Sequence, residues 1–328
     1  MRSLNMEKKF IRNYSIGLAV TLVFLGMISA PTPASDDKKS DSSNEVPVRM
    51  VVTVKPRHSG GQVPAVGPAD VKVYQRDRQN TITSLIPLQG DRAGLELFIL
   101  IDDTSRTSLG LQLDSIKKFI EEQPDTTAIG VGYMRNGTVF TAQNLTKDHA
   151  SAAKSLRLPI GAVAYTSPYL SLSDLMKRWP VSENRREILM ITSGIDPLGG
   201  GFSNDPFTNP YLQAAVDRAQ RGGFIIYSIY APGTGRVGRG FFRGTLAQTG
   251  LDILAQKTGG QTYYLGLGSP VDIAPYLKDV SFSLKHQYQL TFLTKSAKKP
   301  TLEPVKVKTE MPNIGVIAAE DSYVGSGM

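Results

Sequence analysis

The chain has 328 residues, a formal net charge of +8 at pH 7 and no cysteine. Its length suits one or two domains, and its content of 41% hydrophobic and 20% charged residues is typical of a globular protein. The absence of cysteine excludes a disulfide-stapled protein and a diacylated lipoprotein, so packing must provide the stability.

The first 34 residues differ in character from the rest. Four basic residues precede the apolar block 16–30, which at 15 residues is shorter than the roughly 20 needed to cross a bilayer. Small residues follow and favour cleavage after Ala34. We predict a secretory signal peptide over residues 1–34, with an uncleaved membrane anchor as the alternative. A flexible polar leader is predicted over residues 35–45.

Cleavage there changes the expected partners. Removal of residues 1–34 lowers the formal charge from +8 to +5, because it takes away four basic residues and one acidic residue. Such a charge is far below that of a nucleic-acid-binding surface, so no nucleic acid is expected. We expect an exported protein, periplasmic or extracellular, with no stable membrane span after cleavage.

Both flanks of the chain have the pattern of short β-strands. Candidate strands are 48–56, 70–75 and 81–88 on the N-terminal side, and 287–294, 303–311 and 315–320 on the C-terminal side. Each flank is too short for a robust core of its own. We therefore predict that residues 46–90 and 287–328 pack together as one small β module.

Between the flanks, residues 91–286 alternate between strands and helices. The segment 95–101, apolar except for Glu96, is typical of a strand buried on both faces. Further strands are expected at 128–134, 138–143, 187–192, 224–230 and 261–266, and helices at 111–123, 147–158, 168–179, 210–222, 245–260 and 272–286. This alternation predicts an α/β domain with a doubly wound, mostly parallel sheet.

In such a sheet, ligands bind beyond the carboxyl ends of the strands. Four connections leave these ends, at residues 102–108, 157–168, 192–197 and 233–244. The first reads "DDTSRTS" and holds two carboxylates and four hydroxyl side chains. A hard cation such as Mg²⁺ prefers oxygen ligands of this kind, whereas an ordinary polar turn needs the same residues only for its own backbone.

A family resemblance appears at these residues. The buried strand ending in Asp, the Thr ahead of a later helix and the "T-x-G" strand end resemble a von Willebrand factor A (VWFA) domain. "AIGVGYMRNGTV", "SPYLSLSDLMKRWP" and "REILMITSGID" carry the resemblance, which covers roughly residues 46–325. The layout is similar to the VWFA-related acidobacterial family, whose members are exported. This resemblance implies an A-type fold and a metal-ion-dependent adhesion site.

The family site uses Asp-x-Ser-x-Ser, a distant Thr and an Asp in Thr-Asp-Gly. By resemblance, Asp102 takes the first position and Thr104 the second, but Arg106 stands where the second Ser belongs. Thr166 matches the distant Thr, and Ser193 stands at the place of the final Asp.

A shift of the register by one residue gives Asp103, Ser105 and Thr107, an intact oxygen set, although the strand count favours Asp102. Asp196 is the nearest carboxylate that can replace the missing final Asp. The candidate metal ligands are Asp102, Thr104, Ser105, Thr166 and Ser193.

We expect this metal site to be degenerate. The exchange of Asp for Ser removes a negative charge, and a cation at 4 Å opposes a metal ion by roughly 4 kcal/mol at an effective dielectric of about 20. Arg106 is therefore expected to neutralise part of the charge of Asp102 and Asp103. Binding of Mg²⁺ or Mn²⁺ is the alternative. Ser167 before Pro168 also fits a helix N-cap, which leaves Thr166 without need of a ligand.

The connection 233–244 reads "GTGRVGRGFFRG". Its G-x-G-x-x-G match does not predict a nucleotide site, because the next helix is expected only near Thr245 and no acidic residue stands about 20 positions on at the end of a second strand. The candidate partner-binding residues are Arg106, Arg236, Arg239, Arg243 and Phe241, which suit an acidic partner.

Enzyme motifs are missing from the sequence. His58, His149 and His286 are too far apart for a zinc motif, and no serine stands in a nucleophile elbow. We therefore expect a non-enzymatic protein-binding module of the adhesion type. The alternative is a periplasmic structural scaffold with no metal or ligand at the strand ends.

Overall fold

The computed structural model describes residues 45–58, 61–161, 166–199, 205–233, 241–264 and 272–326. The expected signal peptide lies outside these residues, and so does the expected leader except for Glu45, with which the first strand begins. None of the helices in the described ranges is long and apolar enough to span a membrane.

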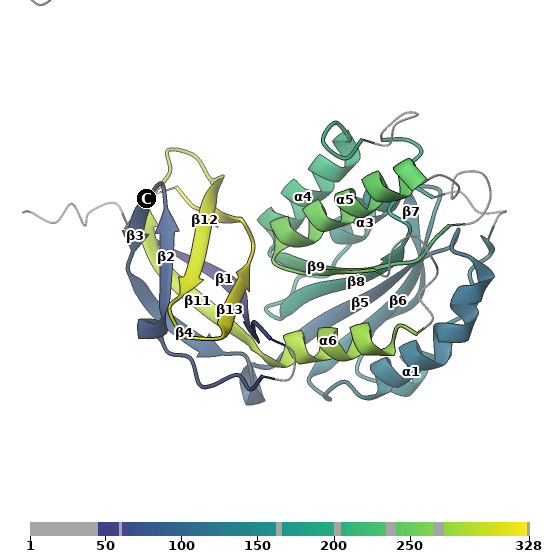
Figure 1. Cartoon of the computed structure of the whole chain (residues 1–328), viewed down its shortest axis with the longest axis horizontal. Coiled ribbons are helices and arrows are strands. Elements are labelled where there is room, and N and C mark those ends of the chain that lie inside the picture. Colours follow the sequence, from purple (N-terminus) through teal and green to yellow (C-terminus); the bar gives the residue numbers. More distant parts are fainter. Residues whose placement is uncertain are drawn as a thin grey trace, which may run out of the picture. The chain divides into compact units, whose positions relative to one another are not determined.

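A six-stranded sheet forms the centre of the α/β domain, in the order β10-β9-β8-β5-β6-β7 (Figure 1). The strands are β5 (Leu95–Asp102), β6 (Thr127–Arg135), β7 (Thr138–Thr146), β8 (Arg185–Thr192), β9 (Phe224–Tyr230) and β10 (Thr262–Tyr263). All neighbours are parallel except β7, which pairs antiparallel with β6 at one edge. All eight residues of β5 are buried, as expected for a central strand whose sequence is apolar except for Glu96 and the final Asp102.

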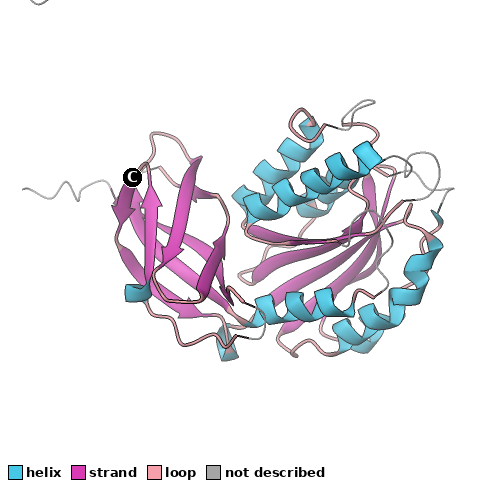
Figure 2. Cartoon of the chain, viewed as in Figure 1, coloured by secondary structure: helices cyan, strands magenta, loops and turns pink. Residues whose placement is uncertain are grey.

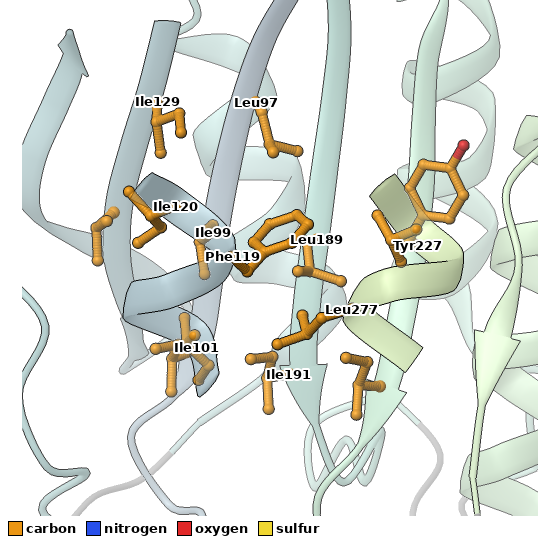
Figure 3. Close-up of a cluster of buried hydrophobic side chains, with 14 of the residues drawn as sticks. Leu97, Ile99, Ile101, Phe119, Ile120, Ile129, Leu189, Ile191, Tyr227 and Leu277 are labelled. Atoms are coloured by element: carbon orange, nitrogen blue, oxygen red, sulfur yellow. The ribbon is translucent and has the colours of Figure 1, made fainter. Parts of the chain in front are cut away.

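Helices cover both faces of this sheet (Figure 2). Side chains from α1 (Leu113–Glu121), α2 (His149–Lys154) and α6 (Ala274–Lys285) share one buried cluster with Leu97, Ile99 and Ile101 of β5 (Figure 3). Side chains from α3 (Pro168–Lys177), α4 (Pro210–Gly222) and α5 (Phe241–Thr258) share a second cluster with Phe98 and Leu100. Successive side chains of β5 point to opposite faces of the sheet and therefore pack into two separate cores.

The β module consists of two four-stranded antiparallel sheets, ordered β13-β1-β11-β4 and β14-β12-β2-β3. Its N-terminal strands are β1 (Glu45–Pro56), β2 (Val71–Gln75), β3 (Arg78–Asn80) and β4 (Ile82–Pro87). Its C-terminal strands are β11 (Gln287–Lys295), β12 (Thr301–Thr309), β13 (Ile314–Ala318) and β14 (Asp321–Val324). Val52, Val73, Leu290 and Phe292 are fully buried in its core. The expected fold class, with a doubly wound sheet and a β module from both flanks, is confirmed.

Some elements differ from expectation. Helix α5 begins at Phe241 and not near Thr245, so Phe241 and Arg243 stand in its first turn and not in a loop. The short strands β3 and β14 were not predicted. Ser167 occupies the N-cap position of α3, but its side chain makes no capping hydrogen bond.

Candidate functional site

The strand order places a topological switch point between β5 and β8. From β5 the chain continues to β6 and β7 on one side, and then crosses to β8, β9 and β10 on the other. Connections that leave β5 and β8 therefore diverge, and ligands of open α/β sheets bind at such a point. We call the edge of the sheet where β5, β8 and β9 end the carboxyl-end edge.

Asp102, the last residue of β5, is held across the switch point. One of its oxygens, Oδ1, accepts hydrogen bonds from the backbone N–H of Thr104 at 2.9 Å and from the Thr104 hydroxyl at 2.7 Å. Its Oδ2 accepts a bond from the hydroxyl of Thr192, the last residue of β8, at 2.8 Å. Asp102 is fully buried. Burial raises the pKa of this carboxyl, although the bonds from Thr104 and Thr192 oppose the shift.

Asp103 is clamped by two arginines. Its Oδ1 lies 2.7 Å from Nη1 of Arg157, and its Oδ2 lies 2.7 Å from Nη2 of Arg135. The backbone N–H of Ile160 also donates to Oδ1, at 3.2 Å. Burial alone would raise the pKa of Asp103, but Arg157 and Arg135 outweigh it and hold that pKa below its ordinary value. The Arg157 guanidinium also lies 3.6 Å from the ring centre of Tyr133.

This clamp corrects the expected role of Arg106. The cations on Asp103 come from Arg135 and Arg157, whereas Arg106 is exposed and its Nε donates to the carbonyl oxygen of Gly233 at 3.3 Å. The sequence could have indicated Arg135, because β6 ends beside β5 and Met134 pairs with Asp102. Arg157 comes from the connection after α2, whose path no sequence pattern predicts.

Two hydroxyls near the switch point have no hydrogen-bond partner. The Ser105 Oγ and the Thr166 Oγ1 are both buried, and neither has a partner within the described part of the chain. Ser193 lies close by, because a Cβ built on Gly233 would stand 3.5 Å from the Ser193 Oγ and 3.8 Å from the Thr104 Oγ1. Unpartnered buried hydroxyls are rare in folded proteins, and each calls for an explanation.

The connection after β8 is tied to the start of α3. The Ser167 hydroxyl donates to Oδ1 of Asp196 at 2.8 Å, and the backbone N–H of Leu198 donates to the same oxygen at 3.1 Å. Thr166, the neighbour of Ser167, therefore lies at the same edge of the sheet as Asp102. Gly194 has a φ of +68°, and a Cβ there would meet the Ala247 carbonyl oxygen at 2.8 Å. This explains the glycine of the "T-x-G" pattern.

The donor set does not fit Mg²⁺ or Mn²⁺. These ions are usually held by one or two carboxylates. The Asp103 carboxylate is neutralised by two arginines, and the carboxylate oxygens of Asp102 and Asp196 already accept hydrogen bonds. Ser105, Thr166 and Ser193 then offer only neutral oxygens. Within the described ranges, no three His, Cys, Asp or Glu side chains gather as a metal cluster.

The remaining predicted residues have different outcomes. Arg236 and Arg239 lie outside the described residues. Arg243 is half-buried in the first turn of α5, next to the exposed Phe242. Phe241 begins the same helix.

Exposed apolar side chains gather in the connections that leave the carboxyl-end edge. Most of the exposed large apolar residues in the described ranges belong there, namely Leu111, Leu158, Ile160, Leu198, Phe207, Phe242 and Tyr264. Leu111, Phe207 and Phe242 are 83%, 71% and 68% exposed. Their shared place in the connections of one edge, and not the exposure of any one of them, is the notable feature.

No protein-family model matches this chain, and no curated protein sequence matches it as a relative. Several solved structures are similar to it. An aerotolerance-related membrane protein from Bacteroides fragilis is 17% identical over 58% of this chain and 98% of that chain, with a TM-score of 0.43. The vWF domain of the type V pili tip protein Mfa5 from Porphyromonas gingivalis is 12% identical over 57% of this chain and 93% of that chain, with a TM-score of 0.40.

Proximal thread matrix protein 1 from the mussel byssus, solved with zinc in its metal-ion-dependent adhesion site motif, is 15% identical over 62% of this chain and 48% of that chain, with a TM-score of 0.40. These likenesses are distant, and the fold class rests on the strand order of the chain itself. They do not single out the acidobacterial family, which stays an expectation from the sequence.

Proposed function

We propose that this chain is an exported, non-enzymatic protein-binding module of the adhesion type, and that its carboxyl-end edge binds a protein partner without a metal ion. The supporting observation is that most of the exposed large apolar side chains in the described ranges belong to connections at this edge of the sheet. Interfaces commonly combine apolar and aromatic anchors with arginine, and the exposed Arg106 lies in this setting.

The partner is proposed to present an acidic group. In A-type domains the metal's open coordination position accepts a carboxylate from the partner. Here the donors are instead the guanidinium of Arg106 and the hydroxyls of Ser105 and Thr166, which have no partner of their own. Both hydroxyls are buried, so the surrounding connections must shift before an acidic group reaches them.

The first test is partner capture by single-residue variants of the full chain. A partner protein is first captured by cross-linking to the parent chain. Leu158→Ser and Phe207→Ser are each expected to lower the yield of this cross-linked partner at least several-fold. The matched control is Val181→Ser, because Val181 is fully exposed and lies between α3 and β8 at the opposite edge of the sheet. If Val181→Ser lowers capture as much as the other two, the proposed surface is wrong.

The acidic group and the metal are tested with the captured partner. Arg106→Ala is expected to weaken binding and to reduce its salt dependence, because it removes an exposed cation. A chelator such as EDTA is expected to leave the affinity unchanged. Loss of binding in EDTA would contradict the metal-free proposal. Loss of capture only after changes within residues 303–320 would favour the scaffold alternative.

Export is tested separately. N-terminal sequencing of the protein recovered outside the cytoplasm is expected to start at Ser35. An unprocessed start at Met1 would favour the membrane anchor.

A further inference from the structure

A cavity lies at the other edge of the central sheet, where β5 and β8 begin. Its volume is about 440 Å³, within the range of roughly 300–1,000 Å³ typical of small-molecule sites. Its wall comes from the connection before β5, the turn between α1 and β6, the start of β8 and the end of α6. The residues that line it include Leu88, Ala93, Leu95, Pro124, Arg185 and Leu284.

The cavity wall is mostly apolar and lacks any acidic side chain. Leu88, Leu95 and Leu284 are all buried. Two cations border it, Arg185 in the wall and the exposed Lys285. A mostly apolar chamber whose two charged lining residues are both cations suits a molecule with an apolar body and an anionic head.

Arg185 forms no direct ion pair with a carboxylate of the described residues, although the charge of Glu187 acts on it from nearby. Its Nη1 donates to the carbonyl oxygen of Leu284 at 3.0 Å and to the side-chain oxygen of Gln287, and its Nη2 donates to the carbonyl oxygen of Ala93 at 3.0 Å. Its Nε is buried without a partner. Among the described residues, no carboxylate oxygen lies within ion-pair distance of the guanidinium, although Glu187 is only two residues further along β8.

An arginine in this state is costly for the fold. A buried charge is stable when it is paired, and its neutral carbonyl partners satisfy hydrogen bonds without cancelling the charge. Three of the five N–H donors of Arg185 already bind neutral protein oxygens, so a carboxylate head would be attracted by the charge of the guanidinium and by the N–H of Nη2 that these bonds leave over.

We propose that this cavity binds a small amphipathic carboxylate, with its head at Arg185 and its apolar body against Leu88, Leu95 and Leu284. The site is separate from the carboxyl-end edge, so it does not depend on the protein-binding proposal. Two sources share this chemistry, an aliphatic fatty acid and an aromatic acid.

The test is isothermal titration calorimetry of the full chain with decanoate, with 2-naphthoate and with the neutral 1-decanol. At least one acid is expected to bind saturably. Binding of decanoate alone would identify an aliphatic fatty acid as the ligand, and binding of 2-naphthoate alone would identify an aromatic acid. Arg185→Gln removes the charge-assisted bonds and is therefore expected to lower the affinity for the acid about tenfold or more. Equal affinity for the acid and the alcohol would overturn the proposal, and so would the absence of saturable binding by either acid.

Two further variants keep the test decisive if Arg185→Gln does not fold. Thr126 is exposed and lines the cavity, so Thr126→Trp is expected to fill the entrance and abolish binding without disturbing the core. Lys278→Ala removes an exposed cation of α6 that does not line the cavity, and it is expected to bind like the parent chain. Full binding by Thr126→Trp would place the acid elsewhere and refute the site.

Discussion

Glu187 has the most unusual environment of a single carboxyl group in the described structure. It is fully buried in β8, beside Arg185, Gln287 and Tyr227. Burial raises its pKa from the ordinary 4.5 to about 7, and the positive charge of Arg185 offsets part of that shift. The folded chain therefore keeps a proton on Glu187 at a pH where the unfolded chain has lost it.

This difference predicts how stability changes with pH. The folded state is favoured by the raised pKa below about pH 4.5, and that contribution is lost as the pH rises through about 7. A shift of this size corresponds to about 3 kcal/mol. Glu187→Gln cannot ionise, so its stability relative to the parent chain should increase by that order between pH 4.5 and pH 8. Urea unfolding at the two pH values measures it, and a pH-independent difference would contradict the assignment.

Some features of the residues at the carboxyl-end edge can be predicted from the sequence, and others cannot. The carboxylates of Asp102 and Asp103 were found because they end a buried strand. The sequence does not predict all of their partners, since Arg157, which binds Asp103, comes from a connection without regular structure. The unpartnered state of the Ser105 and Thr166 hydroxyls depends on atomic positions that no spacing rule provides.

At the level of elements, the boundaries that local chemistry sets were the ones predicted well. Helix α4 covers Pro210–Gly222, as predicted, because proline stands at its first position and Gly223 ends it with a φ of +64°. Strand β9 also matches its predicted bounds. Helix α5 begins earlier than expected. The sequence predicted a loop at its first turn because that segment is rich in glycine.

The N-cap of α4 gives an element-level prediction. The Asn209 side chain accepts bonds from the N–H groups of Tyr211 and Leu212, at 2.9 and 3.1 Å, and it is buried. Asn209→Ala is expected to cost about 2 kcal/mol, the upper part of the range for cap removal. Asp148→Ala, at the exposed cap of the short helix α2, is expected to cost about 0.5–1 kcal/mol. Thermal unfolding of both variants checks the order, and an equal loss would refute it.

At the level of the whole chain, the β module and the α/β domain draw their cores from different parts of the sequence. The two cores of the central sheet use residues from Leu95 to Leu284, whereas the core of the β module combines residues before and after that stretch. Alternating patterns predicted this division. They did not predict the pairing, because β1 joins both β11 and β13 and no local signal specifies long-range partners.

Deletion of residues 297–328 tests this division. It removes β12, β13 and β14, so β2 loses its partner β12 and β1 keeps only β11. The backbone amides of β1 and β11 are expected to exchange hydrogen at least tenfold faster, which corresponds to about 1.4 kcal/mol of lost protection, while β5 and β8 stay protected. Lys306→Ala, an exposed change on β12, serves as the control. Equal loss of protection in β5 would show that the two parts unfold together.

The long reach of β1 has a consequence during synthesis. Val48 pairs with Phe292, so a chain that leaves the ribosome from its N-terminus makes this strand long before the segments that flank it. Until those segments are synthesised, the valine-rich strand β1 has two unpaired edges, which can pair with the strands of other nascent chains.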